Sequence, residues 1–298
     1  MNMKTPKKST PQVIEELRPG QSIELLKELH ILTREGKLNQ DTRRKLKQVY
    51  HLYQFIEPLL EGALKTDAAF TLADHGAGKS YLGFILYDLF FNVAHAGQQA
   101  AGHIYGIETR PELVEKSRTL ATRLGFERMS FLNLSVKEST GSTDLPSRID
   151  IVTALHACDT ATDDAIAFGL AKLAQHMVLV PCCQAEVAGV LKANRAASLT
   201  KTPLAELWRH PLHAREFGSQ ITNVLRCLQL EASGYNVTVT ELVGWEHSMK
   251  NELILASKPA VPNPAKTSAA QNRLHQVLAE LGLGAPGQAA LEQRFAIG

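Results

Sequence analysis

Short apolar runs alternate with amphipathic helical patterns over residues 66–258, which is typical of a sheet of parallel strands connected by helices. A mainly helical stretch, 185–232, interrupts the alternation before the last two runs. We therefore expect an α/β fold with a helical insertion. The apolar runs predict seven strands, at Phe70–Ala73, His103–Ile107, Ser130–Leu134, Ile149–Leu155, Met177–Val180, Asn236–Leu242 and Glu252–Ser257.

The segments on either side of this region have different patterns. Residues 1–65 are helical and charged, with one helix expected to begin after Ser9-Thr10 at Pro11. A second helix has one apolar face, formed by Leu46, Val49, Tyr53, Ile56 and Leu60. Residues 259–298 begin with three prolines, as a linker would, and then show a helical pattern around Leu274–Leu281. We thus predict three zones: a basic helical extension (1–65), a catalytic domain (66–258) and a tail (259–298).

Composition excludes several classes of protein. With 44% hydrophobic residues among 298, the chain is too apolar for a disordered protein. The best candidate for a membrane span, Tyr81–Ala96, contains Asp88, and no signal peptide is recognised, so we expect a cytoplasmic protein without a membrane partner. The four cysteines fit neither a disulfide framework nor a paired zinc site. They are Cys158, Cys182, Cys183 and Cys227.

Charge is distributed unevenly along the chain. The net charge is +2, but residues 1–50 hold eleven basic and six acidic residues, which leaves the remainder at −3. Four of the basic residues fall in the first turns of the second predicted helix, at Arg43, Arg44, Lys45 and Lys47. This concentration favours an anionic partner such as RNA.

A glycine-rich loop follows the first predicted strand, in the order Asp74-His75-Gly76-Ala77-Gly78-Lys79-Ser80. Glycines let a backbone approach a ligand, and the helix that follows offers free N–H groups. The spacing from Ala73 to Ser80 also satisfies a relaxed phosphate loop, which makes a phosphate-loop nucleotidase the rival hypothesis. Two features speak against a phosphate loop. Its first position is Ala73 and not glycine. The acid available to hold magnesium, Asp159, comes well after the end of its strand.

The same loop fits S-adenosylmethionine better. Asp74-x-Gly76-x-Gly78 is the pattern that ends the first strand of class I methyltransferases, and Glu108 ends the second strand, where a carboxylate accepts hydrogen bonds from ribose hydroxyls. We expect Asn133 and Leu155, at the ends of the third and fourth strands, to complete the cofactor site. The 30 residues from Gly78 to Glu108 exceed the usual 20 or so and predict a long first helix or loop. Without a ligand, Gly76 and Gly78 would be ordinary turn glycines, and Glu108 would cap the helix that follows it.

Two unusual segments follow the fourth and fifth strands: Leu155-His156-Ala157-Cys158-Asp159-Thr160-Ala161-Thr162-Asp163 and Val180-Pro181-Cys182-Cys183. With the glycine loop and Lys250-Asn251, they resemble a subgroup of class I methyltransferases related to tRNA ribose methyltransferases, over about residues 45–258. The resemblance implies a Rossmann-like seven-stranded methyltransferase sheet, S-adenosylmethionine as cofactor and RNA modification as the activity. Ser80 departs from the glycine that is common in these relatives.

Several kinds of chemistry are open to the residues at these strand ends. His156 or Asp159 could act as a general base, whereas Cys182 or Cys183 could attack a pyrimidine ring as a thiolate. The His/Cys cluster could also bind zinc, although its spacing is irregular, and the cysteines could simply pack near the ligand. We expect no metal, and we assign His156, Asp159, Cys182, Cys183 and Lys250 to the catalytic set.

Other residues could contact a nucleic acid. Lys79 and Lys250 are candidates for a phosphate contact, although a solvated lysine is the plainer interpretation of Lys79. Trp245 and His247 could stack on a base, whereas Tyr235 is better explained by core packing. The overall prediction is an S-adenosylmethionine-dependent methyltransferase acting on RNA. A cofactor-binding module without catalysis is a further alternative, and the oligomeric state is left open.

Overall fold

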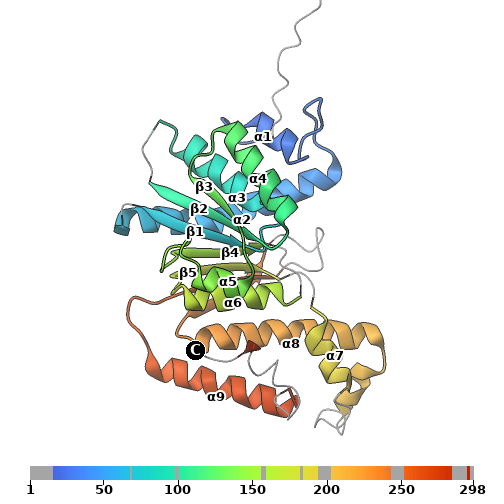
Figure 1. The fold of residues 1–298 in the computed structure, drawn as a ribbon. Coiled ribbons are helices and arrows are strands. Elements are labelled where there is room, and N and C mark those ends of the chain that lie inside the picture. Colours follow the sequence, from blue (N-terminus) through green and yellow to red (C-terminus); the bar gives the residue numbers. More distant parts are fainter. Residues whose placement is uncertain are drawn as a thin grey trace, which may run out of the picture.

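The sheet has seven strands in the order β3-β2-β1-β4-β5-β7-β6 (Figure 1). The structure is a computed structural model that describes residues 16–67, 69–97, 101–155, 159–181, 184–193, 203–242, 252–283 and 294–295. The first five strands are parallel, and β7 runs antiparallel to both β5 and β6. This order, with a reversed strand near one edge, is the fold of class I methyltransferases, as predicted.

All seven predicted strands are present, with boundaries within two residues of expectation. Their bounds are β1 Phe70–His75, β2 Gly102–Glu108, β3 Met129–Asn133, β4 Ile151–Leu155, β5 His176–Val180, β6 Asn236–Glu241 and β7 Glu252–Ser257. The central strands β1, β4 and β5 are buried on both faces, which explains why their sequences read as continuous apolar runs.

One face of the sheet is covered by helices from the first part of the chain. These are α1 Ile23–Glu28, α2 Gln40–Asp67, α3 Tyr81–Tyr87 with its π-helical continuation η1 Asp88–Ala94, and α4 Pro111–Leu124. The predicted apolar face of α2 enters the same core as Leu72 and Phe84. The predicted boundary at residue 65 therefore falls inside a helix that packs on the sheet.

The continuation of α3 into η1 accounts for the long gap between the glycine loop and Glu108. Asp88, which interrupts the longest apolar run, is fully buried and accepts hydrogen bonds from the backbone N–H of Ser22 at 2.9 Å and from Nδ2 of Asn92 at 3.0 Å. It thus joins η1 to the segment that leads into α1. Within the described residues, no helix is long and apolar enough to cross a membrane.

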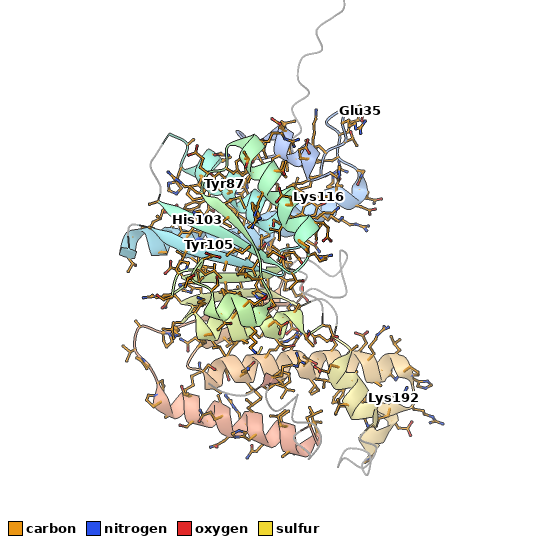
Figure 2. All side chains as sticks on the ribbon, in the orientation of Figure 1. Glu35, Tyr87, His103, Tyr105, Lys116 and Lys192 are labelled. Atoms are coloured by element: carbon orange, nitrogen blue, oxygen red, sulfur yellow. The ribbon has the colours of Figure 1, made fainter. Side chains whose placement is uncertain are left out.

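The opposite face of the sheet carries α5 Val136–Gly141, α6 Ala161–Ala171 and α8 Pro211–Ala232. A further layer packs on α8, made of α7 Glu186–Ala193, the 3-10 helix η3 Pro203–Trp208 and α9 Pro264–Glu280 (Figure 1). Lys192 on α7 projects away from the body of the molecule (Figure 2). Leu274 and Leu278 of α9 are buried in this layer, so the tail docks on the predicted insertion.

Candidate functional site

The glycine loop connects β1 to α3 and has the backbone geometry that its sequence predicts. Gly76 and Gly78 have φ values of +69° and +58°, in the left-handed region that favours glycine. Ser80 also lies there, with φ +54°, a conformation that is strained for a residue with a Cβ atom. The loop is held against β2 by a hydrogen bond from the backbone N–H of Ala77 to the carbonyl of Ile107 at 3.0 Å.

Glu108 ends β2 directly beside this loop. Its carboxylate accepts hydrogen bonds from the backbone N–H of Gly78 at 2.8 Å and from the backbone N–H of Arg110 at 3.1 Å. The Arg110 guanidinium also reaches both carboxylate oxygens, each at 3.1 Å. Burial raises the pKa of Glu108, but the hydrogen bonds from Arg110 and Gly78 outweigh it and hold the pKa below its usual range. The acid is therefore ionised at neutral pH.

The strand-end acid thus fits the ribose of S-adenosylmethionine. A carboxylate has about four acceptor positions, and Arg110 fills several of them in this structure. The Arg110 side chain is 59% exposed, whereas that of Glu108 is 8% exposed, so Arg110 is the partner that can move aside. Once the guanidinium has moved aside, the two ribose hydroxyls would donate hydrogen bonds to the two carboxylate oxygens of Glu108.

Asp74 is turned into the protein and away from the loop. It is 2% exposed, and its Oδ1 accepts a hydrogen bond from the Thr153 hydroxyl of β4 at 2.9 Å. Burial raises its pKa to about 7, opposed by hydrogen bonds from Thr153 and from the backbone of Gly83. Asp74 therefore joins β1, β4 and α3, and we propose that it supports the cofactor loop from beneath.

His75 was not singled out by its sequence context, yet it is the most unusual residue of the loop. It is 5% exposed, its ring lies 5.3 Å from that of Phe168, and neither ring nitrogen has a hydrogen-bond partner among the described residues. Burial lowers its pKa to about 4, so the ring is neutral. An unsatisfied buried imidazole is costly. Its place inside the predicted cofactor loop is the sequence feature that could have singled out His75. Two ring nitrogens without a partner among the described residues are consistent with a ligand at this edge of the sheet.

Asn133 and Leu155 end the two strands that flank this region. Nδ2 of Asn133 donates a hydrogen bond to the carbonyl of Glu108 at 3.0 Å and so fixes the end of β2. Leu155 is half-buried against the apolar core of the α3 face. We retain both as proposed cofactor-site residues.

The end of β4 is held by a buried network that begins on α8. Arg226 is fully buried and binds both carboxylate oxygens of Asp163 at 2.7 Å. Its Nη2 also donates to the carbonyl of Asp159 at 2.9 Å, and its Nη1 donates to Oδ1 of Asn223 at 3.1 Å. One arginine therefore fixes both the loop after β4 and the start of α6.

The same network continues to β5 and β7. Gln184, which follows β5, donates to Oδ1 of Asn223 at 2.8 Å, and Asn223 donates in turn to Glu252 at the start of β7 at 2.6 Å. The carboxylate of Asp159 accepts from the backbone N–H of Ala185 at 3.1 Å. Asp159 itself is exposed, with a φ of +52°. The predicted proton acceptor is thus presented to solvent on a loop whose base is rigid.

Several predicted residues lie outside the described part of the chain. These are His156, Cys158, Cys182, Cys183, Trp245, His247 and Lys250. Cys227 is free and partly buried on α8, and burial raises the pKa of its thiol to about 12. Tyr235 is buried, and its hydroxyl donates to the carbonyl of Ala174 at 2.6 Å, so core packing is confirmed for this residue. Among the described residues, no group of histidine, cysteine and acidic side chains could hold a metal ion.

Comparison with known families supports the assignment of the fold to the methyltransferases. Residues 44–190 match a family described as a methyltransferase domain. None of the curated proteins searched matches the sequence.

Three solved structures are similar to the chain. An rRNA methylase from Streptococcus thermophilus is 9% identical, with a TM-score of 0.42, over 69% of this chain and 93% of that one. A magnesium protoporphyrin IX methyltransferase from Synechocystis PCC 6803 is 14% identical, with a TM-score of 0.42, over 78% and 94%. A precorrin-6y C5,15-methyltransferase from Geobacter metallireducens is 17% identical, with a TM-score of 0.37, over 69% and 88%.

Proposed function

We propose that this chain, a class I S-adenosylmethionine-dependent methyltransferase by its family match and its sheet order, transfers the methyl group to RNA. The cofactor supplies a methyl group activated on a sulfonium. The observation that carries the RNA proposal is the placement of the basic cluster Arg43, Arg44, Lys45 and Lys47 in the first turns of α2.

The topology brings this cluster to the edge of the sheet where the site lies. α2 ends at Asp67 and β1 begins at Phe70, so the two elements run in opposite directions, and α2 begins on the side where β1 ends. A helix of 28 residues is about 42 Å long, whereas a strand of six residues spans about 20 Å. The first turns of α2 therefore reach past the end of β1.

The cations of the cluster are exposed on this projecting part of the helix. Arg43 forms an ion pair with Glu16 at 2.8 Å, whereas Arg44, Lys45 and Lys47 have no ion-pair partner among the described residues. Cations without an acidic partner among the described residues attract a polyanion that approaches this edge.

We assign the chemical step to the loop after β4. A methyl acceptor with an O–H or N–H group loses a proton as it attacks the methyl carbon, so a base must stand close to it. We propose Asp159 or His156 for this task, with Lys250 contacting the RNA. One oxygen of Asp159 accepts the Ala185 N–H, which leaves the other to take the proton. Cys182 and Cys183 are proposed as packing residues, and the covalent route is the alternative for them.

The proposal is tested by transfer of a tritiated methyl group from S-adenosylmethionine into separated RNA and protein fractions. We expect label in RNA with the wild-type chain and a marked loss with Glu108→Ala. Label in protein alone would contradict the RNA proposal. Cofactor binding without label in either fraction would favour the non-catalytic module.

A second test uses the salt dependence of RNA binding. Neutralising Arg43, Arg44, Lys45 and Lys47 should reduce the slope of log affinity against log salt by about 0.7 for each phosphate of single-stranded RNA that these cations neutralise in the wild type. The matched control is Lys65→Ala with Arg148→Ala, because these exposed cations lie at the opposite edge of the sheet. An unchanged slope in the cluster variant would remove the argument from charge.

A further inference from the structure

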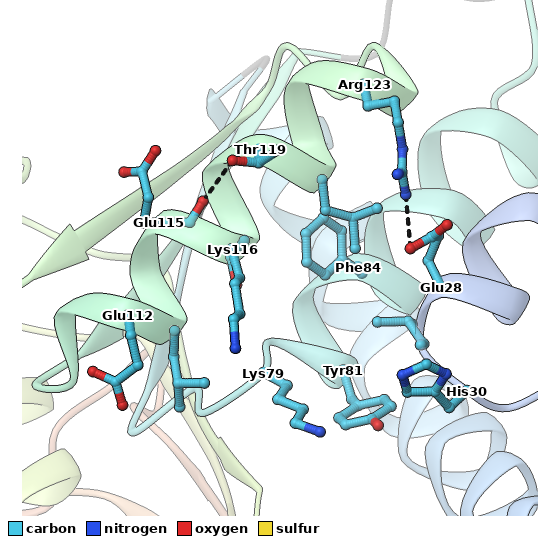
Figure 3. Close-up of a pocket in the computed structure, with 14 residues that line it drawn as sticks. Glu28, His30, Lys79, Tyr81, Phe84, Glu112, Glu115, Lys116, Thr119 and Arg123 are labelled. Carbon is cyan, nitrogen blue, oxygen red and sulfur yellow. Dashed lines mark hydrogen bonds and ion pairs between the residues drawn. The ribbon is translucent and has the colours of Figure 1, made fainter.

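A cavity of about 670 Å³ lies beside the glycine loop, on the face of the sheet that α3 and α4 cover. Its walls come from the end of α1 and the turn after it, from the start of α3, and from α4 (Figure 3). None of the residues expected to hold the cofactor lines it. The cavity is therefore a separate candidate site, adjoining the cofactor site through Lys79, which follows Gly78 directly.

The inner part of the cavity is apolar. Leu29 and Phe84 are buried, and Leu120 of α4 is half-buried beside them. An ion pair closes one end of the cavity, between Nη2 of Arg123 and the carboxylate of Glu28 at 2.8 Å. The charges of these two side chains are thus largely satisfied, and the space between them and the opening suits a flat or apolar group.

The opening carries positive charge. Lys116 extends from α4 and Lys79 from the glycine loop, and the two side chains face the same space beside Tyr81 (Figure 3). Neither lysine has a hydrogen bond or an ion pair to any described residue. His30 lies next to Tyr81 on the third side of the opening (Figure 3).

The acidic residues of the rim do not cancel this charge locally. The side chains of Glu112 and Glu115 point away from the opening (Figure 3), and Glu115 lies 3.8 Å from Arg118 on the outer side of α4. Two ammonium groups therefore share one opening with a tyrosine and a histidine ring, above an apolar floor.

We propose that this cavity binds a nucleoside phosphate, with the phosphate between Lys79 and Lys116 and the base against Tyr81 and the apolar floor. Two ammonium groups recognise a phosphate, and an aromatic ring beside an apolar surface accommodates a base. The volume lies within the range of small-molecule sites. The phosphate can belong to a free mononucleotide or to an RNA chain, and only the second source depends on the RNA activity proposed above.

The test measures binding of uridine 5′-monophosphate by calorimetry with saturating S-adenosylhomocysteine present. S-adenosylhomocysteine occupies the proposed cofactor site, and a pyrimidine nucleotide lacks the adenine that this site would recognise. Together they prevent the nucleotide from binding at Glu108 instead of in the cavity. We expect affinity to fall about ten-fold or more in Lys116→Ala and to be retained in Lys116→Arg. Uridine should bind at least ten-fold more weakly than its monophosphate. Lys137→Ala, an exposed lysine on α5 outside the cavity, is the control that should leave affinity unchanged.

A single-stranded RNA oligonucleotide then distinguishes the two sources. Displacement of the mononucleotide by RNA, with weaker RNA binding in Lys116→Ala, assigns the cavity to the RNA substrate. Mononucleotide binding that RNA does not displace supports a site for a free nucleotide, whatever the methyl acceptor. Absence of mononucleotide binding at millimolar concentration, or equal binding in the wild type and Lys116→Ala, would overturn the proposal.

Discussion

The proposed site has two ends, one where β1 and β2 end and one where β4 and β5 end. At the β1–β2 end, Glu108 accepts hydrogen bonds from Gly78 and from Arg110, which lies two positions along the chain. At the β4–β5 end, Asp159 and Asp163 are held by Arg226, more than 60 residues away in the sequence. The two ends also differ in exposure. The Arg110 side chain is 59% exposed, but that of Arg226 is completely buried. Because the Arg110 guanidinium can turn into solvent, its hydrogen bonds to Glu108 can be exchanged for those of a ligand. A buried pair cannot be broken without a large loss of stability.

We propose that this difference separates two tasks. The β1–β2 end has an acid whose hydrogen bonds can pass from Arg110 to a ribose, as a site that binds and releases a cofactor requires. The β4–β5 end has an exposed carboxylate on a rigid base, which suits a group that must be positioned for a reaction. Through Arg226, the insertion that contains α8 therefore holds the loop of the proposed base Asp159, although the two are remote in the sequence.

The largest expected effect comes from breaking the buried pair. Arg226→Met should lower the free energy of unfolding by about 3–5 kcal/mol, because Asp163 is left buried without its partner. The double variant Arg226→Met with Asp163→Leu should be less destabilised than Arg226→Met alone. Urea unfolding measures both, and Arg215→Ala, which loses an exposed pair on the same helix, is the control. A loss below 1 kcal/mol in Arg226→Met would contradict the rigid-base interpretation.

Asp74 joins the two ends, and its ionisation should make stability depend on pH. Its pKa is raised to about 7 in the folded chain, from an ordinary value near 4, so folding favours the protonated acid. The stability that this acid contributes is present below about pH 4 and is lost as the pH rises towards 7. Asp74→Asn cannot ionise. Between pH 4.5 and 8 it should gain stability relative to the wild type, on the order of a few kcal/mol. A constant difference across that range would show that Asp74 ionises normally.

The cofactor end is tested by Glu108→Ala. Loss of charge-assisted hydrogen bonds to the ribose should cost about 1.5–3 kcal/mol of S-adenosylmethionine binding. Glu112→Ala, an exposed acid on the first turn of α4, is the matched control. Wild-type affinity in Glu108→Ala would exclude this acid from the cofactor site.

The smallest effect is expected from Arg110→Ala. The substitution removes an exposed competitor for the Glu108 carboxylate, so cofactor affinity should stay within about three-fold of the wild type or rise. Calorimetric titration with S-adenosylhomocysteine measures it. A ten-fold loss would mean that Arg110 binds the cofactor itself.

The sequence predicted most of the fold because the strands are short apolar runs, and it predicted the glycine loop because positive φ values require particular residues. The inward turn of Asp74 was not anticipated, although Asp74 and the buried Leu72 lie on the same face of β1. Arg226 could not be found from the sequence, because an arginine within an amphipathic helix reads as a surface residue until the tertiary packing buries it. The predicted residues His156, Cys182, Cys183 and Lys250 lie outside the described part, so their roles remain predictions.

The central claim is that the β1–β2 end binds the cofactor and the β4–β5 end supports the reaction. It is tested most directly by measuring Kd for S-adenosylmethionine and the methyl-transfer rate in both Glu108→Ala and Asp159→Ala. Glu108→Ala should raise Kd by about 10–150-fold. Asp159→Ala should leave Kd within a few-fold and lower kcat by about 10²–10⁴-fold, as expected for loss of a positioned base. Equal losses of affinity in both variants, or full turnover in Asp159→Ala, would contradict the account.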